Sequence, residues 1–377
     1  MDFIIDGNAY LNVAISVTRS MVFRDKRFGN KYWVNDILND GGKILKEEIK
    51  VKFKDFCLNY LSSLIAPIGN RLDRVHLVFD SKSWRKEYVQ SYFIENSFST
   101  TSSPVEFKYK GNRKKDDSIY LFFEYFQNEI VPKLVEESGI NYYRIKGTEG
   151  DDIIAHLCEQ LDEDILIYTV DGDLRQLTHS KNNVMLIYPK QSSGHKKIFV
   201  PREFKPERAT EEENFFSLTE SSILEPTRVK IVDSFKRKEY VEYEVDPVEE
   251  IFLKILRGDP KDNIPKMDKI TPTKASNIIS DIKESYGERS IDLLDEDDSE
   301  FIGFIIERIS VYNKIKDLQK IIDTRKHFDL NTRLVRLRTR LFPEDVIGSL
   351  NEDFKDRILT NFIPSKFNHL KNNTYLI

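Results

Sequence analysis

The sequence predicts an α/β fold with a mostly parallel central sheet flanked by helices. Two observations lead to this prediction: short apolar runs such as FIID (3–6) and VHLVFD (75–80), and longer segments between them with apolar residues at helical spacing. Strands that alternate with helices along a chain form parallel sheets covered on both faces. With 377 residues, the chain is long enough to bury a large core, as one big domain or two smaller ones.

The expected elements follow a regular order along the chain. Strands are predicted at 3–6, 75–80, 141–145, 164–171 and 184–189. Helices are predicted at 43–65, at 118–137, from EGDD (149–152) onward, and in a series from 247 to about 325.

Two segments interrupt this order. Residues 81–117 run from a polar, turn-rich stretch into the basic YKGNRKKDD, which indicates a mobile, partly helical segment. Residues 191–245 are charged with little periodicity, which indicates an insertion or an edge ribbon. We therefore expect four parts, at 1–190, 191–245, 246–350 and 351–377.

Composition excludes several classes of protein. No apolar stretch approaches the roughly 18 residues of a membrane span, and MDFIID has no basic-then-apolar signal layout. Two cysteines, Cys57 and Cys158, cannot form a disulfide framework, and the six histidines show no zinc-like spacing. We therefore expect an intracellular, cytoplasmic protein.

The charges are segregated, although the net charge is only −5. One group of basic residues comprises Lys108, Lys110, Arg113, Lys114 and Lys115. A second comprises Arg333, Arg336, Arg338 and Arg340. Because the distribution of charge matters more than its sum, the net charge does not exclude nucleic acid as a partner.

Nine acidic residues lie at or near the ends of the apolar runs or in short acidic motifs. They are Asp6, Asp80, Glu149, Asp151, Asp152, Asp171, Asp173, Asp259 and Asp262. The carboxyl ends of strands meet at the edge where open α/β sheets keep their sites. Several carboxylates gathered there would require hard cations, and an all-oxygen site suits Mg²⁺ or Mn²⁺.

Taken singly, these acids have simpler interpretations. Asp6 and Asp80 could be helix caps or turn acids after strands. The acids of EGDD could simply stabilise a helix N-terminus through their negative charge. Asp171 and Asp173 are two apart, so in an extended segment both would point to one side; a D-G turn is the alternative. Asp259 and Asp262 would share a face of a helical turn, or belong to a solvated loop.

The motifs IIDGN, VFD, YKGNR, EGDD, TVDGD and ILRGDPKDNIP occur in this order over most of residues 1–190 and 247–350. In this the sequence resembles the structure-specific 5′ nucleases, the flap endonucleases and 5′–3′ exonucleases. It is most similar to the bacteriophage members, which include the ribonuclease H of T-even phages. The resemblance implies a PIN-like nuclease core at 1–190, a helical arch or clamp at 81–117, and a helical DNA-binding region at 246–350.

The resemblance also implies a phosphodiesterase with two divalent ions, Mg²⁺ or Mn²⁺. The first ion would be surrounded by Asp6, Asp80, Glu149, Asp151 and Asp171. The second would be held, partly through water, by Asp173, Asp259 and Asp262, with Asp152 as an outer-sphere ligand or orienter. Two such ions bind one scissile phosphate, lower the pKa of the attacking water and stabilise the departing oxygen.

The basic motif YKGNR matches the family's active-site cations. The resemblance implies that Lys110 and Arg113 stabilise charge on the phosphate in the transition state. Lys108, Lys114 and Lys115 would steer phosphates, and Tyr109 would stack a frayed base. Without the resemblance, the whole patch would read as a solvated basic loop.

Residues 255–285 resemble the family's helix-hairpin-helix, which grips the duplex backbone. The glycine-rich hairpin is replaced here by KMDKITPTKASNII, and no glycine lies between Gly258 and Gly287. Backbone N–H groups could still reach a phosphate with help from Lys269, Thr271, Thr273 and Lys274. This departure puts the potassium site of some relatives in doubt.

The expected function is a metal-dependent 5′–3′ exonuclease and flap endonuclease that removes RNA primers and 5′ flaps in replication or repair. Its expected substrates are branched, flapped or 5′-ended DNA and RNA/DNA duplexes. The protein is expected to be a monomer, in the host cytoplasm if phage-encoded. A sliding clamp or single-strand-binding protein could bind the tail, although a plain helix or frayed end is the stronger expectation.

Two alternatives remain at this point. A non-catalytic protein of the same fold could bind branched DNA, but pure binding has no use for a negative cluster. FIIDGN and VDGD also suit a phosphatase of the haloacid-dehalogenase type. That class needs a second Asp two residues after its nucleophile, and position 8 is Asn.

Overall fold

A computed structural model describes residues 1–24, 38–39, 44–66, 68, 72–96, 109–111, 117–180, 184–189, 196–200, 230–233, 246–287, 289–355, 357 and 359–372. Most of the expected insertion at 191–245 and residues 97–108 of the expected arch lie outside this part, as do four basic residues of the expected site. These four are Lys108, Arg113, Lys114 and Lys115.

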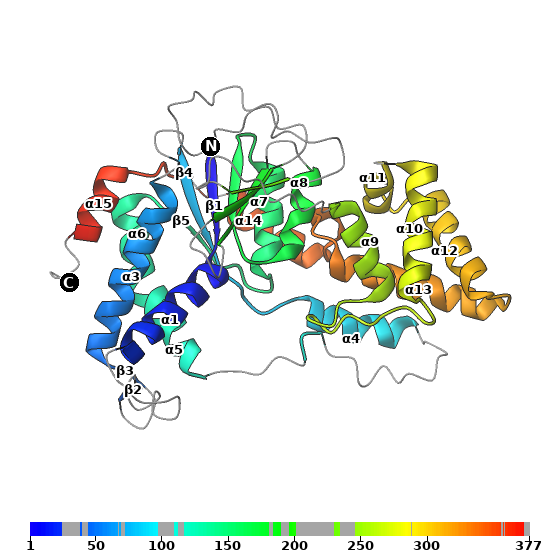
Figure 1. The fold of residues 1–377 in the computed structure, drawn as a ribbon, viewed down its shortest axis with the longest axis horizontal. Coiled ribbons are helices and arrows are strands. Elements are labelled where there is room, and N and C mark those ends of the chain that lie inside the picture. Colours follow the sequence, from blue (N-terminus) through cyan, green and yellow to red (C-terminus); the bar gives the residue numbers. More distant parts are fainter. Residues whose placement is uncertain are drawn as a thin grey trace.

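A single large sheet forms the centre of the molecule, in the order β5-β4-β1-β6-β7-β8-β9 (Figure 1). Its strands are β1 (Asp2–Asp6), β4 (Arg74–Val78), β5 (Asn141–Tyr143), β6 (Ile165–Tyr168), β7 (Val184–Pro189), β8 (Lys196–Val200) and β9 (Lys230–Asp233). The first five are mutually parallel, and β8 and β9 continue the sheet in antiparallel pairing. The predicted mostly parallel sheet is therefore confirmed.

The two faces of the sheet carry different helices, as the alternation along β1 shows. Phe3 and Ile5 face one core and Ile4 faces the other. The first core is covered by α1 (Gly7–Arg24), α3 (Glu47–Ile65), α5 (Asp117–Tyr125), α6 (Val131–Ser138) and α15 (Pro364–Asn372). The second is covered by α7 (Gly150–Gln160) and α14 (Glu344–Lys355). Figure 1 shows the two groups on opposite sides of the strands.

Several predicted boundaries shift. The helix expected at 43–65 begins only at Glu47, because Ile44 and Leu45 form β3, which pairs with β2 (Leu38–Asn39). The helix expected at 118–137 is divided by a π-helical turn at Phe126–Ile130. Pro132 at the start of α6 lacks an amide hydrogen, so the regular hydrogen bonding is interrupted there. In the tail, α15 buries Phe367 and Leu370, as expected of a plain helix.

The remaining helices form a lobe beside the sheet, at the right of Figure 1. They are α4 (Arg85–Asn96), α9 (Pro247–Arg257), α10 (Pro272–Tyr286), α11 (Arg289–Asp295), α12 (Ser299–Asn313) and α13 (Leu318–Val335). They share one hydrophobic core, which includes Phe252 and Phe301. The expected helix-hairpin-helix segment is the pair α9 and α10 with the loop 258–271 between them.

A buried arginine joins the lobe to the rest of the molecule. Arg336 is 1% exposed and donates to both carboxylate oxygens of Asp295, each at 2.7 Å. Its third donor reaches Gln176 at the end of a 3-10 turn, Gly172–Gln176, at 2.6 Å. The short helix α8 (Leu177–Ser180) and the turn Thr339–Leu341 complete the described elements. None of the helices in the described ranges is long and apolar enough to cross a membrane.

The loop after α9 begins at Gly258, whose backbone only glycine adopts readily. Its φ is 69° and its ψ is 178°, and a Cβ there would lie 2.3 Å from the carbonyl oxygen of Ile264. Holding a residue other than glycine in this backbone conformation costs about 1–3 kcal/mol of conformational free energy, before the steric clash is counted. The glycine therefore sets the path of the loop that carries Asp259 and Asp262.

We expect Gly258→Ala to lower the free energy of unfolding by at least about 2 kcal/mol. The matched control is Gly348→Ala in α14, where a Cβ meets nothing within 4 Å. That change should be neutral or stabilising by up to about 1 kcal/mol, because alanine favours helix more than glycine does. Urea unfolding of the two variants and wild type measures both effects. Equal stability of the two variants would contradict the strain assigned to Gly258.

Candidate active site

The parallel strands bring acidic residues to one edge of the sheet. Asp6 is the last residue of β1 and pairs in register with Val78, two residues before Asp80. Tyr168 ends β6 beside Ile5, and Asp171 follows three residues later. The expected gathering of strand-end acids at the carboxyl edge is therefore observed.

Asp6, Asp80 and Asp151 form the accessible part of the acidic site. Asp6 and Asp151 are half-buried and Asp80 is exposed. Asp6 accepts hydrogen bonds from the Ala9 amide at 3.0 Å and the Thr169 hydroxyl at 2.9 Å. Asp80 accepts one from the Gly150 amide at 2.6 Å. Among the described residues, none of these three carboxylates forms an ion pair with a lysine or arginine.

Their pKa values reflect this lack of partners. Loss of hydration, together with the nearby charges of Asp80 and Asp171, raises the pKa of Asp6 to about 6. Loss of hydration and the charges of Asp171 and Asp6 raise the pKa of Asp151 well above its usual range. Loss of hydration raises the pKa of Asp80 as well, against the opposing effects of the Gly150 amide and the Lys110 charge. The mutual repulsion shows that these carboxylates share one region.

The start of α7 is held by cations and hydrogen bonds. Glu149 and Asp152 form a capping box in which the Asp152 carboxylate accepts the Glu149 amide at 3.0 Å. Asp152 is fully buried and is paired with Arg85, and it also accepts the Trp84 indole N–H at 3.0 Å. Asp152 therefore lies behind the accessible acids, as expected of an orienting residue.

Lys110 and Tyr109 lie between Glu149 and Asp262. The Lys110 ammonium donates to Glu149 Oε1 and lies 3.7 Å from Asp262 Oδ2. The Tyr109 hydroxyl donates to Glu149 at 3.1 Å and to Asp262 at 3.3 Å. Although burial acts to raise the pKa of Glu149, Arg85 and Lys110 hold it below its usual value.

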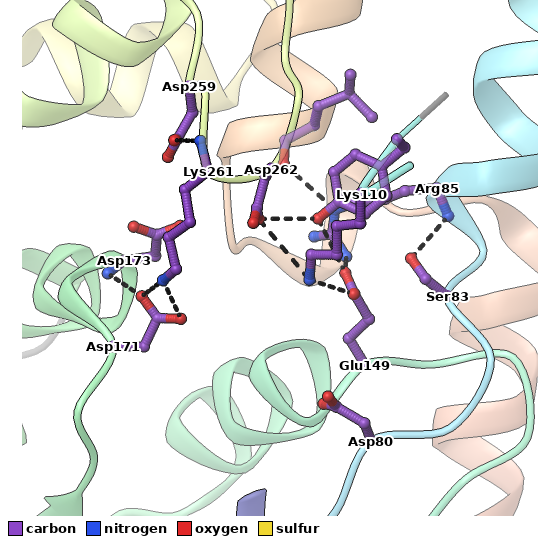
Figure 2. A network of polar contacts seen from close by, with 12 residues as sticks. Asp80, Ser83, Arg85, Lys110, Glu149, Asp171, Asp173, Asp259, Lys261 and Asp262 are labelled. Carbon is purple, nitrogen blue, oxygen red and sulfur yellow. Dashed lines mark hydrogen bonds and ion pairs between the residues drawn. The ribbon is translucent and has the colours of Figure 1, made fainter. Parts of the chain in front are cut away.

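A second group of acids is neutralised by two lysines. Lys254 forms ion pairs with Asp173 and, at 2.9 Å, with Asp259. Lys261 lies 3.0 and 3.1 Å from the two carboxylate oxygens of Asp171, as Figure 2 shows. Burial alone would raise the pKa of Asp171 and of Asp259, but Lys261 and Lys254 respectively lower them. Burial and the Asp171 charge raise the pKa of Asp173 in spite of Lys254.

The backbone at Asp171 and Asp173 differs from the expected extended segment. The strand β6 ends at Tyr168, and Asp171 caps a 3-10 turn by accepting the Asp173 amide at 3.2 Å. The D-G turn was the correct alternative, because the aspartate side chain bonds its own backbone two residues on. Both acids nevertheless lie at the site. Asp259 and Asp262 belong to a tight loop closed by two hydrogen bonds between Asp259 and Ile264, of 2.8 and 3.1 Å.

The two groups of acids meet in a narrow cleft. Its lining includes Asp151 from the accessible group, with Glu149, Asp173, Asp259 and Asp262. As the side chains stand, no three acidic, histidine or cysteine residues in the described part of the chain converge closely enough to hold a metal ion. The donor chemistry still fits, because Asp6, Asp80 and Asp151 offer carboxylate oxygens that solvent reaches, and none of the described lysines and arginines forms an ion pair with them. Mg²⁺ and Mn²⁺ take few direct carboxylates and keep several waters.

Two expected binding roles need correction. The Tyr109 ring is 4% exposed and packs in the core of the helical lobe, so it is not presented for stacking on a base. Thr271 caps α10 by accepting the Lys274 amide, and the Lys274 ammonium donates to the Lys269 carbonyl and to Asn313. Lys269 and Thr273 are exposed on the loop and the first turn of α10, where a phosphate could reach them.

Three cations of the site were missed in the sequence. They are Arg85 behind α7, Lys254 within α9 and Lys261 between Asp259 and Asp262. Lys254 had a signal, since it lies five residues before Asp259, on the helix that leads into the acidic loop. No signal in the sequence pointed to Arg85, because its partners Glu149 and Asp152 are 64 and 67 residues away.

Part of the chain is similar to known exonucleases. A family model described as "5′-3′ exonuclease, N-terminal resolvase-like domain" matches residues 46–211. The curated "5′-3′ exonuclease" of Buchnera aphidicola subsp. Schizaphis graminum is 27% identical over 220 residues. That match covers 56% of this chain and 55% of the relative, so the chain spans about half the length of its relative.

Residues 46–211 are thus similar to the N-terminal domain of 5′–3′ exonucleases.

Weaker likenesses exist among solved structures. The T5 D15 protein, co-crystallised with metal ions, is 17% identical with a TM-score of 0.48, and the match covers 94% of this chain and 98% of that one. The catalytic core of Rad2 in complex with DNA substrate is 14% identical with a TM-score of 0.32, covering 93% of this chain and 86% of that one. Both TM-scores are too low to bear on the fold of this chain.

We expect Mg²⁺ to raise the thermal stability of the protein, and Asp151→Asn to reduce the effect. An ion that binds only the folded state at ten times its dissociation constant stabilises it by about 1.4 kcal/mol, or roughly 2 °C for a large chain. The measurement is the melting temperature with EDTA and with increasing Mg²⁺. Asp353→Asn, which breaks a half-buried pair with Arg357 away from the acids, is the control and should behave as wild type. The same shift in all three proteins would place the ion elsewhere.

Proposed function

We propose that the protein is a divalent-metal-dependent 5′–3′ exonuclease and flap endonuclease that hydrolyses phosphodiesters. The observation that carries this proposal is the accessible trio of Asp6, Asp80 and Asp151. None of the three forms an ion pair with a described lysine or arginine, although the charge of Lys110 acts on Asp80 and Asp151. Buried acids of the same site, Glu149 and Asp152, are neutralised by Arg85 and Lys110. A charged group left unpaired only where solvent reaches it is expected of a site that binds external cations.

The chain's own residues then have separate tasks. Asp6, Asp80 and Asp151 would hold the first divalent ion, and Asp171, Asp173, Asp259 and Asp262 would contribute to a second once Lys254 and Lys261 turn away. Two bound ions supply an activated water and stabilise the departing oxygen. Lys110, fixed by the Asp262 carbonyl through its amide at 2.9 Å, presents its ammonium at the same cleft. There a cation stabilises the charge that develops on the phosphate.

The substrate proposal is flapped or 5′-ended DNA and RNA/DNA duplexes, so the activity would remove RNA primers and 5′ flaps in replication or repair. The lobe with α9, the loop 258–271 and α10 would bind the duplex, with Lys269 and Thr273 exposed near its start. Arg113 is proposed as a second active-site cation, and Lys108, Lys114 and Lys115 as phosphate-steering residues. We also propose that the protein acts as a monomer in the cytoplasm and binds a sliding clamp or a single-strand-binding protein.

The main alternative is a protein of the same fold that binds branched DNA without cutting it. The two functions differ at the accessible acids, because three like charges at a DNA-binding surface repel phosphates unless cations bind there. A phosphatase of the haloacid-dehalogenase type would need a second acid at position 8, and Asn8 follows the end of β1 instead.

The test is cleavage of a labelled 5′-flap duplex with Mg²⁺. Wild type should release short 5′ products, EDTA should abolish cleavage, and Asp151→Asn should lower the rate by about 10²-fold or more. Asp353→Asn should cleave as wild type does. Binding of the flap substrate without cleavage by wild type would favour the non-catalytic alternative, and full activity of Asp151→Asn would refute the assigned site.

A second prediction concerns Lys110. Lys110→Ala should reduce the rate of flap cleavage by about 10²–10³-fold, since one preorganised donor to the developing charge has about this effect. The control is Lys50→Ala on α3, far from the acids, which breaks a pair with Glu47 and a cation–π contact with Tyr125. The measurement is the single-turnover rate at saturating enzyme. A change confined to DNA affinity would contradict a role for Lys110 in the chemical step.

A further inference from the structure

We propose that Arg85 is a positioning residue, which fixes the acid-bearing start of α7 and couples it to the end of α13 in the helical lobe. The inference rests on the proposed function, because the acids that Arg85 positions are those of the proposed nuclease site. In the described part of the chain, Arg85 forms no hydrogen bond or ion pair with Asp6, Asp80 or Asp151. It lines the inner wall of the cleft and is only 1% exposed.

The contacts of Arg85 extend in three directions. One terminal nitrogen donates to Glu149 Oε2 and to Asp152 Oδ2, each at 3.0 Å. The other lies 2.8 Å from Asp152 Oδ1, an ion pair that is close but poorly aligned for a hydrogen bond. The remaining N–H donates to the Leu334 carbonyl at 3.2 Å. The guanidinium also lies 4.6 Å from the centre of the Trp84 ring.

These contacts determine where the first turn of α7 lies. Asp151 stands between the two residues that Arg85 holds, Glu149 and Asp152, and its backbone cannot move without moving theirs. Gly150, in the same turn, donates its amide to Asp80. Arg85 thereby acts, through neighbours, on the placement of both Asp151 and Asp80 relative to each other.

The contact with Leu334 connects this turn to the helical lobe. Leu334 is the second-last residue of α13, and the last carbonyls of a helix lack partners within the helix. Arg85 is also the first residue of α4, which packs against α13. The arginine is therefore a junction of three helices, and only one of them carries active-site acids.

An arginine is required because three acceptors lie around one planar group. The guanidinium carries five N–H donors in a fixed fork, whereas a lysine carries one nitrogen on a flexible stem. A lysine at position 85 would keep the positive charge but could not serve Glu149, Asp152 and Leu334 together. Arg85→Lys thus separates the positioning role from a role of charge alone.

The structure supplies a matched control in Arg74. Its guanidinium forms a two-point pair with the fully buried carboxylate of Asp2, at 2.6 and 2.8 Å. Asp2 begins β1, so this pair lies at the edge of the sheet opposite to Asp6. Arg74→Lys therefore repeats the chemical change of Arg85→Lys away from the site.

The experiment compares wild type, Arg85→Lys, Arg74→Lys, Asp152→Asn and the double variant Arg85→Lys/Asp152→Asn. Three quantities are measured: Mn²⁺ affinity from the electron paramagnetic resonance signal of free Mn²⁺, affinity for the flap duplex in EDTA, and the single-turnover cleavage rate with Mg²⁺. Thermal melting checks that each variant is folded.

Arg85→Lys should weaken Mn²⁺ binding by about 10-fold or more and slow cleavage by about 10²-fold, while DNA affinity stays within about threefold. Arg74→Lys should change neither metal affinity nor rate. In the Asp152→Asn background, Arg85→Lys should lower Mn²⁺ affinity and cleavage rate much less than it does in wild type, because Arg85 acts through Asp152.

The inference is overturned if Arg85→Lys binds Mn²⁺ and cleaves as wild type does, or if the double variant shows additive losses. Failure of Arg85→Lys to fold, while Arg74→Lys folds, would also overturn it in favour of a purely structural role. If wild type binds Mn²⁺ but does not cleave the flap, the proposed function fails separately. The Mn²⁺ affinities of Arg85→Lys and Arg74→Lys then still decide whether Arg85 positions the acids.

Discussion

The structure depends on how the charges of acids crowded at one sheet edge are balanced. The balance follows burial: Glu149, Asp152 and Asp259 are nearly inaccessible to water, and each is paired with a lysine or arginine of the chain. Removing one partner of a buried ion pair leaves an uncompensated charge, which is strongly destabilising. The acids without such partners are the ones that water reaches. The buried acids are thus neutralised within the protein, and the accessible acids remain free to bind external cations.

Much of this arrangement follows from short-range rules, and so could be predicted. Parallel pairing of β1, β4 and β6 forces the ends of these strands to one edge, which is why the acids after FIID, VHLVFD and DILIY were found together. The expected extended backbone at Asp171 was wrong, and the cause is again local. Its carboxylate can bond the Asp173 amide, so the chain leaves the strand early and turns.

The cations could not be predicted in the same way, because their partners are distant in the chain. Arg85 contacts the carbonyl of a residue 249 positions away, and Lys261 meets an acid 90 positions away. Composition reveals that such charges exist, but not which acid each will neutralise. The same reason explains Tyr109, whose aromatic ring suggested an exposed stacking platform and is instead buried against the helical lobe.

The site is therefore a property of the contact between the sheet and the helical lobe. Asp6, Asp80 and Asp151 come from the sheet and α7, whereas Asp259, Asp262 and Lys254 come from the lobe. The two sets are joined by the amide of Lys110 on the Asp262 carbonyl and by Arg85 between α7 and α13. A duplex bound by the lobe would thus act on the same contact that completes the acidic cleft, which ties the binding of a substrate to the geometry needed to cut it.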